Sequence, residues 1–400
     1  MSFTEPKNKG AGLTSDSYSV TCNTQISNVK HYKLVIRMEK YLIPLVPGPV
    51  AVPQEILKVA AQNFGSADFE LEYVALYRET EALLQKMMKT RNRVVIQTGE
   101  GMLVLWTALK STLKPGDRVL VLSTGLFGEG FADMAKAIGC EAKILDFGYD
   151  ETFHDFDAIE KAIVEFKPKM ITMVQNETPS GTTNPVQEIG DLKVKHGVPL
   201  LCVDIVSGLG GTPINIDAWH VDLALGGSQK CLSAPANMSF LSVSEGAWEI
   251  VKNVNYAGYE ALLPFLTAPE TGYFPYTPYW QGTAQLHKAC ELIFEEGLDS
   301  CIARHEKVAA YCRERIKDMG LKLYPAADAV CSPTVTAVYV PEHMTWERLD
   351  SELRVQGMVV GGNYGKLAGK VFRIGHMGSQ ANINLIKEAM DILETVVHDI

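Results

Sequence analysis

The sequence lacks any apolar run close to the roughly 20 residues that are needed to span a membrane. It also lacks an excess of positive charge, because 37 Lys and Arg face 47 Asp and Glu and the formal net charge is −10. This balance argues against nucleic acid or an anionic membrane as a partner. The eight cysteines form no Cys-x-x-Cys pair and no Cys/His spacing of a zinc site. We therefore expect no metal, reduced thiols and a cytoplasmic protein.

Residues 1–40 are polar, without the apolar core of a secretory signal, and no arginine precedes Arg37. We expect a polar N-terminal tail there rather than a targeting segment. A Pro- and Tyr-rich stretch after about residue 255 interrupts the pattern of the preceding chain. We therefore expect a large domain over residues 41–285 and a small C-terminal α/β domain over 286–400.

Short apolar runs rich in β-branched residues alternate with helical patterns between about residues 90 and 245. The predicted strands cover 93–99, 117–124, 141–147, 169–177, 199–206, 222–228 and 239–245. The predicted helices cover 103–113, 130–139, 157–166 and 186–197, with further helices at 284–297, 299–320, 346–357 and 382–399. Strands that are buried on both faces and separated by helices indicate an α/β fold with a mainly parallel sheet of seven strands.

Ligands of such sheets bind beyond the carboxyl ends of the strands, so the residues that follow each strand carry the functional information. Asp204 ends the apolar run "PLLCVD", and Lys230 follows the run "DLALGGS". The turn 99–102 precedes a helix, and Phe127 and Thr178 follow two further strands. One amine, one carboxylate, one aromatic ring and hydroxyl groups are therefore expected at one edge of the sheet.

This set of groups is the one that a pyridoxal-type cofactor needs. A lysine amine forms a Schiff base with an aldehyde, and a carboxylate keeps the pyridine nitrogen protonated so that the ring can accept electrons. An aromatic side chain stacks on the ring, and a helix N-terminus offers unpaired N–H groups to an anion. Each residue alone also has an ordinary structural interpretation, as a loop charge for Lys230, a turn cap for Asp204 and a core side chain for Phe127.

Five segments together resemble the class V aminotransferases of fold type I, a group that includes alanine–glyoxylate and serine–glyoxylate aminotransferases. They are "PGPVAVP" (47–53), "NETPSGTTNP" (176–185), "VDIVSGLGG" (203–211), "GGSQKCLSAP" (226–235) and "RIGHMG" (373–378). The resemblance covers about residues 41–395, and the pyridoxamine–pyruvate aminotransferases are the most similar group. It implies a pyridoxal 5′-phosphate enzyme whose large domain, 41–285, binds the cofactor.

Residue by residue, the resemblance makes Lys230 the Schiff-base lysine and Asp204 the partner of the pyridine nitrogen. Phe127 takes the ring-stacking position, and Thr178 lies near the phenolic oxygen. Arg373 matches the arginine that binds the substrate carboxylate. The phosphate site is assigned to Gly99, Glu100, Gly101, Met102 and Gln229, together with Thr277, which reaches the phosphate of the neighbouring subunit. The last assignment implies a homodimer or tetramer with shared active sites.

The expected reaction moves an amino group from alanine or serine to glyoxylate or pyruvate, with no nucleic acid or membrane as a partner. One alternative takes unphosphorylated pyridoxamine or pyridoxal as a substrate and keeps no permanent cofactor. An alternative of another class is a non-catalytic α/β protein that binds a small ligand. A lyase or desulfurase on the same fold is disfavoured, because no cysteine lies in an obviously mobile Gly/Ser/His loop.

Glu100 lies in the turn that is expected to hold the phosphate, where a carboxylate is repulsive. Either its side chain points away and serves as an acid at a helix N-terminus, or it faces the site and accepts a hydrogen bond from a hydroxymethyl group. The first orientation is compatible with a phosphorylated cofactor, and the second favours an unphosphorylated one.

Overall fold

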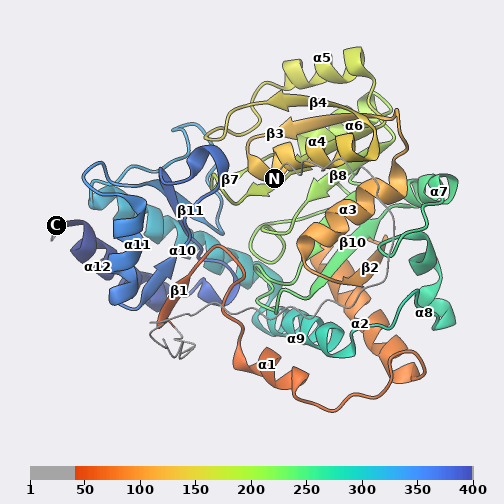
Figure 1. Ribbon diagram of the computed structural model, residues 1–400, viewed down its shortest axis with the longest axis horizontal. Coiled ribbons are helices and arrows are strands. Elements are labelled where there is room, and N and C mark those ends of the chain that lie inside the picture. The colour runs from red at the N-terminus through yellow and green to blue at the C-terminus, as the bar shows by residue number, and fades with distance from the viewer. Residues whose placement is uncertain (1–40, 399–400) are drawn as a thin grey trace, which may run out of the picture. The chain divides into compact units, whose positions relative to one another are not determined.

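The computed structural model describes residues 41–398, and its central element is a sheet of seven strands (Figure 1). Their spatial order is β2–β10–β9–β8–β5–β3–β4. The strands are β2 (Arg93–Thr98), β3 (Arg118–Ser123), β4 (Glu141–Asp146), β5 (Met170–Val174), β8 (Leu200–Asp204), β9 (Leu223–Gly227) and β10 (Met238–Val243). All seven match strands predicted from the sequence.

Only β10 runs against its neighbours, since it pairs antiparallel with both β2 and β9. The pairs β9–β8, β8–β5, β5–β3 and β3–β4 are parallel. Six carboxyl ends therefore meet at one edge of the sheet. The expected mainly parallel α/β fold is confirmed.

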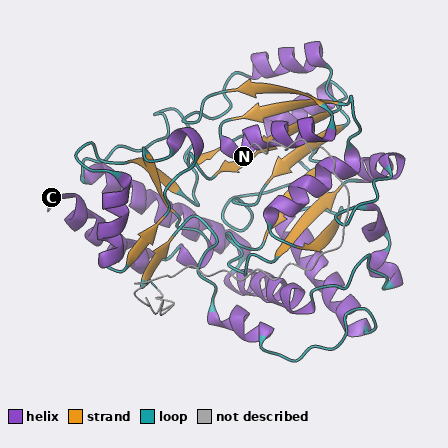
Figure 2. Cartoon of the chain, in the orientation of Figure 1, coloured by secondary structure: helices purple, strands orange, loops and turns teal. Residues whose placement is uncertain are grey.

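Helices flank this sheet, as Figure 2 shows, and the central strands β5, β8 and β9 are fully buried. Helix α3 packs against β9 and β10, α4 against β3, β4 and β5, and α2 against β2. The helices of this part are α1 (Gln54–Ala60), α2 (Leu71–Met88), α3 (Gly101–Thr112), α4 (Leu126–Ile138), α5 (Phe156–Phe166), α6 (Gln187–Lys195), α7 (Glu245–Val254), α8 (Ala268–Thr271) and α9 (Trp280–Glu296). A short hairpin, β6 (Asn176–Glu177) and β7 (Thr182–Thr183), follows β5.

The C-terminal part has its own hydrophobic core, between helices and two small sheets. Its elements are α10 (Leu298–Asp318), β11 (Thr336–Tyr339), α11 (Trp346–Val355), β12 (Met358–Val360), β13 (Val371–Ile374) and α12 (Ile383–His398). Strand β1 (Ile43–Leu45) belongs to this core and pairs in parallel with β12. The first core extends from Ile56 to Cys301, and the predicted domain boundary at residue 285 stays a prediction.

Several elements differ from the sequence prediction, and helices α1, α7 and α8 and strand β12 have no predicted counterpart. Helix α4 begins at Leu126, four residues before the predicted segment, so Phe127 lies in its first turn. Helix α2 was not predicted, because Thr80 and Glu81 on its buried side interrupt the apolar periodicity. Strand β1 is only three residues long and was not predicted either. The predicted N-terminal tail, 1–40, lies outside the described residues. No helix within 41–398 is long and apolar enough to cross a membrane.

Candidate active site

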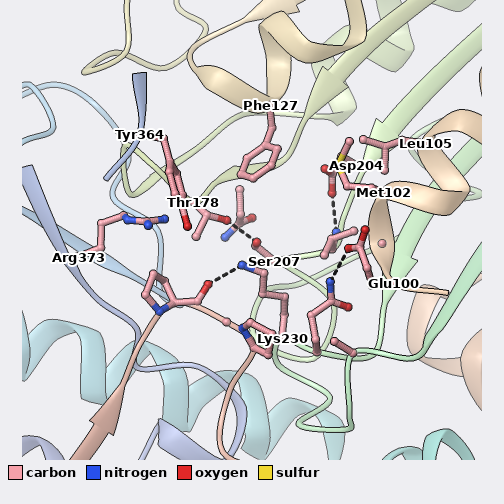
Figure 3. A pocket seen from close by; sticks show the side chains of 18 residues that line it. Glu100, Met102, Leu105, Phe127, Thr178, Asp204, Ser207, Lys230, Tyr364 and Arg373 are labelled. Carbon is pink, nitrogen blue, oxygen red and sulfur yellow. Dashed lines mark hydrogen bonds between the residues drawn. The ribbon is translucent and has the colours of Figure 1, made fainter. Parts of the chain in front are cut away.

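A cavity of about 270 Å³ lies beyond the carboxyl ends of the parallel strands (Figure 3). Its wall brings together most of the residues singled out in the sequence, although they come from distant segments. Glu100, Gly101, Met102, Phe127, Thr178, Asp204, Gln229, Lys230 and Arg373 all line it. The order of the strands explains this convergence, because the loops after β2, β3, β5, β8 and β9 open at the same edge.

The amine of Lys230 lies in this cavity and donates a hydrogen bond of 2.5 Å to the carbonyl of Pro47. Burial, and secondarily the charge of Arg373, lowers the pKa of Lys230 from the ordinary lysine value to about 8. A buried amine near neutrality is easily deprotonated and can act as a nucleophile or base. This environment distinguishes Lys230 from a solvated loop lysine.

Asp204 ends the buried strand β8, and its carboxylate accepts the N–H of Val206 at 2.7 Å. Its side chain is 7% exposed, and burial raises its pKa to about 6. The side chain of Asp204 is therefore ionised at neutral pH and poorly accessible to solvent. A cationic ring nitrogen would be a strong partner for it.

Phe127 and Thr178 line the cavity from two different segments. The ring of Phe127 projects into the cavity from the first turn of α4 (Figure 3). The hydroxyl of Thr178 shares a hydrogen bond of 2.5 Å with the hydroxyl of Ser207, which also lines the cavity. Ser207 was not named as a site residue, although it lies in the segment 203–211 that carries the family resemblance.

Glu100 faces the cavity at the N-terminus of α3, at the opposite end from Arg373 (Figure 3). Its carboxylate accepts a hydrogen bond of 3.0 Å from the amide nitrogen of Gln229. Of the two orientations considered for this side chain, the structure has the one that points toward the site. The side-chain amide of Gln229 therefore donates to the carboxylate of Glu100 in this structure.

Arg373 comes from β13 in the C-terminal part and is 4% exposed. Its Nε and one terminal nitrogen donate to the carbonyl of Gly362 at 2.8 and 2.6 Å, and the ring of Tyr364 lies 5.1 Å from its guanidinium carbon. Within residues 41–398 it forms no ion pair with a carboxylate. A buried guanidinium without a structural counter-ion suits a ligand carboxylate.

Two predicted site residues lie outside the lining of the cavity. Gly99 is in the turn before α3 and donates its N–H to the carbonyl of Asn237. Thr277 is exposed in the loop between α8 and α9. The lining residues Pro47, Gly48 and Tyr364 were not predicted as site residues. Pro47 and Gly48 lie in the segment 47–53 that carries the family resemblance, and Tyr364 lies two residues after a glycine pair.

Comparison with known proteins identifies the family of this chain. The family model described as aminotransferase class V matches residues 52–378. An uncharacterised aminotransferase of Methanocaldococcus jannaschii is 37% identical over 84% of this chain and 87% of its own. The pyridoxamine–pyruvate transaminase of Mesorhizobium japonicum is 32% identical over 85% of this chain and 87% of its own.

Among solved structures, the alanine–glyoxylate aminotransferase of Nostoc sp. superimposes with a TM-score of 0.86 at 28% identity. The match covers 95% of this chain and all of that one. The expected fold type I architecture is thereby confirmed. Because the family model spans most of the chain, the protein belongs to the class V aminotransferases and is an enzyme of that family.

Proposed function

We propose that this chain moves an amino group from a small amino acid, such as alanine or serine, to a small 2-oxo acid, such as glyoxylate or pyruvate, with pyridoxal phosphate in the cavity. The observation that supports this most strongly is that Lys230 and Arg373 line one cavity. A buried amine with a lowered pKa, and a guanidinium that forms no ion pair within residues 41–398, are the two groups that a reaction at the α-carbon of an amino acid requires.

The residues present fit the ring of the cofactor. Asp204 would pair with the pyridine nitrogen, Phe127 would cover one face, and the Thr178–Ser207 hydroxyl pair would reach the phenolic oxygen. Pyridoxal phosphate supplies an aldehyde that condenses with amines and a ring that withdraws electrons from the substrate's α-carbon.

Lys230 would hold the cofactor and, once displaced by the substrate amine, carry the proton that leaves the α-carbon. The lowered pKa of Lys230 supports this role, because a neutral amine accepts a proton without a large penalty. Arg373 would bind the carboxylate and fix the substrate. Its anchoring to the carbonyl of Gly362 orients the guanidinium before substrate arrives.

A second candidate, in which pyridoxamine itself is the amino donor, is favoured by one observation. Glu100 faces the cavity where the first turn of α3 would bind a phosphate. Two unit charges of the same sign about 4 Å apart cost about 4 kcal/mol at an effective dielectric constant of 20. A hydroxymethyl group would instead donate a hydrogen bond to this carboxylate.

The position of Thr277 supports the proposal of an oligomer. This threonine is exposed and outside the cavity of its own chain, as expected for a residue that completes the site of a second copy. We propose a homodimer with shared active sites.

Two measurements test these proposals. The loaded protein should have a visible absorbance band that alanine or serine bleaches and pyruvate or glyoxylate restores, whereas Lys230→Ala should show neither the band nor turnover. A wild-type band that no small amino acid changes would contradict the aminotransferase proposal.

The vitamer is tested by titrating the apo-protein with pyridoxal and pyridoxal phosphate, in wild type and Glu100→Gln. Tighter binding of pyridoxal phosphate to the wild type supports the first candidate. Tighter binding of pyridoxal, reversed by Glu100→Gln, supports the second.

A further inference from the structure

Glu177, at the end of the short strand β6, is a buried carboxylate to which the mechanism above gives no role. Its side chain is 0% exposed, and within residues 41–398 no Lys, Arg or His forms an ion pair with it. The nearby charges of Asp204 and Glu129 are also negative. Burial raises the pKa of Glu177 to about 7, which reflects the cost of keeping a charge there.

The carboxylate is held by the first turn of α4. Its two oxygens accept the main-chain N–H groups of Phe127 at 3.0 Å and Gly128 at 3.2 Å. These groups have no partner inside the helix, and the N-cap residue, Gly125, has no side chain to satisfy them. Glu177 therefore caps α4 from a segment about fifty positions away in the chain.

The fit between the two segments is close. A Cβ atom added to Gly125 would lie 2.3 Å from Cγ of Glu177, which is far inside van der Waals contact. A larger residue at position 125 would therefore push the carboxylate away from the two N–H groups. The contact depends on both residues, Glu177 and Gly125.

Glu177 also joins two residues that line the cavity. Its side chain holds the main chain of Phe127, and the next residue along its own chain is Thr178. The contact between Glu177 and the first turn of α4 is therefore one of the links that set the distance between the Phe127 ring and the Thr178 hydroxyl. Within residues 41–398, no other side chain forms a hydrogen bond with the main chain of Phe127 or Thr178.

We infer that Glu177 is a positioning residue, whose carboxylate fixes the first turn of α4 so that Phe127 can stack on the ring of the bound vitamer. The inference rests on the proposed function, because it requires a pyridoxal ring in the cavity. It assigns Glu177 no contact with substrate and no proton transfer.

The test measures how tightly the apo-protein binds pyridoxal and pyridoxal phosphate, by titration of the visible circular dichroism band. An aromatic stack contributes about 0.5–1.5 kcal/mol, so Glu177→Gln should weaken binding roughly 2- to 12-fold and reduce the band per bound ligand. Phe127→Leu should have an effect of similar size. Adding Glu177→Gln to Phe127→Leu should weaken binding no further, because the ring through which Glu177 acts is already absent.

Glu81→Gln is the matched control. Glu81 is a buried carboxylate that accepts the main-chain N–H of Val94 and does not line the cavity, although unlike Glu177 it also forms an ion pair with Arg93. Its substitution should lower the melting temperature and leave binding and dichroism unchanged. If Glu177→Gln fails to fold, Gly125→Ala disturbs the same contact from the other side and should reproduce the loss.

Unchanged binding and dichroism in Glu177→Gln would overturn the inference. A loss that adds fully to that of Phe127→Leu would overturn it too, because Glu177 would then act by another route. If the wild-type protein binds neither vitamer, the proposed function fails and the inference fails with it. If the wild-type protein binds a vitamer and Glu177→Gln binds it equally well, the inference is refuted and the proposed function is not.

Discussion

The amine of Lys230 donates its hydrogen bond to the carbonyl of Pro47, 183 positions earlier in the chain. The segment after β1 therefore forms the wall against which the lysine rests. The next residue, Gly48, has φ +89°, and a Cβ atom there would lie 2.5 Å from Cδ of Lys230. The position of the amine thus depends on a glycine in a distant segment.

We expect Gly48→Ala to reduce kcat roughly 10- to 100-fold, because the new methyl group displaces the lysine from its working position. The matched control is Gly116→Ala, since Gly116 has φ +87° and nothing within 4 Å of an added Cβ. Both variants should lose similar stability, because both place alanine in the left-handed region. Equal kcat values for the two variants would refute a specific role for Gly48.

Arg373→Ala should lower kcat/KM for the oxo acid roughly 10- to 150-fold, the cost of losing a charge-assisted pair of about 1.5–3 kcal/mol. Its melting temperature should change little, because within residues 41–398 the guanidinium of Arg373 forms no ion pair and donates hydrogen bonds only to the carbonyl of Gly362. Arg304→Ala is the contrast, since Arg304 binds Glu296 and the carbonyls of Gly378 and Ala381. Arg304→Ala should have a lower melting temperature than the wild type. The molecules that remain folded should keep a near-normal kcat/KM. The reverse pattern would make Arg373 a structural residue.

The rate at which the apo-protein reacts with pyridoxal should rise with pH, reach half its maximum near pH 8 and level off above that. The sign follows from the lowered pKa of Lys230, about 8, because only the neutral amine is a nucleophile. Arg373→Met removes a nearby positive charge, so the pKa of Lys230 should rise and the curve should move to higher pH. Stopped-flow absorbance measures the rate, and a wild-type midpoint above pH 10 would contradict the described environment.

Acid should destabilise the protein partly through His305. Its Nε2 accepts the N–H of Gly378 at 2.8 Å, and burial lowers its pKa to about 4. Between about pH 6.5 and 4 the unfolded state binds a proton that the folded state does not, so stability falls as pH falls in that window. The loss due to His305 should reach roughly 3 kcal/mol at pH 4.

Urea denaturation at several pH values measures this loss. His305→Gln should flatten the pH dependence, whereas His343→Gln, at an exposed position, should leave it unchanged. An unchanged slope in His305→Gln would show that another group carries the effect. Buried His376, with its pKa lowered to about 3, should maintain part of the slope in either variant.

The sequence predicts the sheet well, because the central strands are short and mainly apolar, and polar residues follow several of them. Lys230 and Asp204 stand out for that reason, and the strand order brings them together. The role assigned to Arg373 came from the family resemblance, since nothing in its own segment indicates a free guanidinium. Pro47, Tyr364 and Glu177 acquire their importance only through contacts between distant segments, which no local pattern reports. The orientation of Glu100 likewise depends on Gln229, across the cavity.

The pairing of β1 with β12 also has a consequence for synthesis on the ribosome. The segment that includes Pro47 has no partner strand until residues 358–360 have left the exit tunnel. All seven strands of the large sheet have been synthesised well before then, because the last of them ends at Val243, so that sheet can form first. Closing so long a loop is entropically costly, so the wall behind Lys230 should form late. The nascent enzyme then becomes competent to bind its ligand only when nearly the whole chain has been translated.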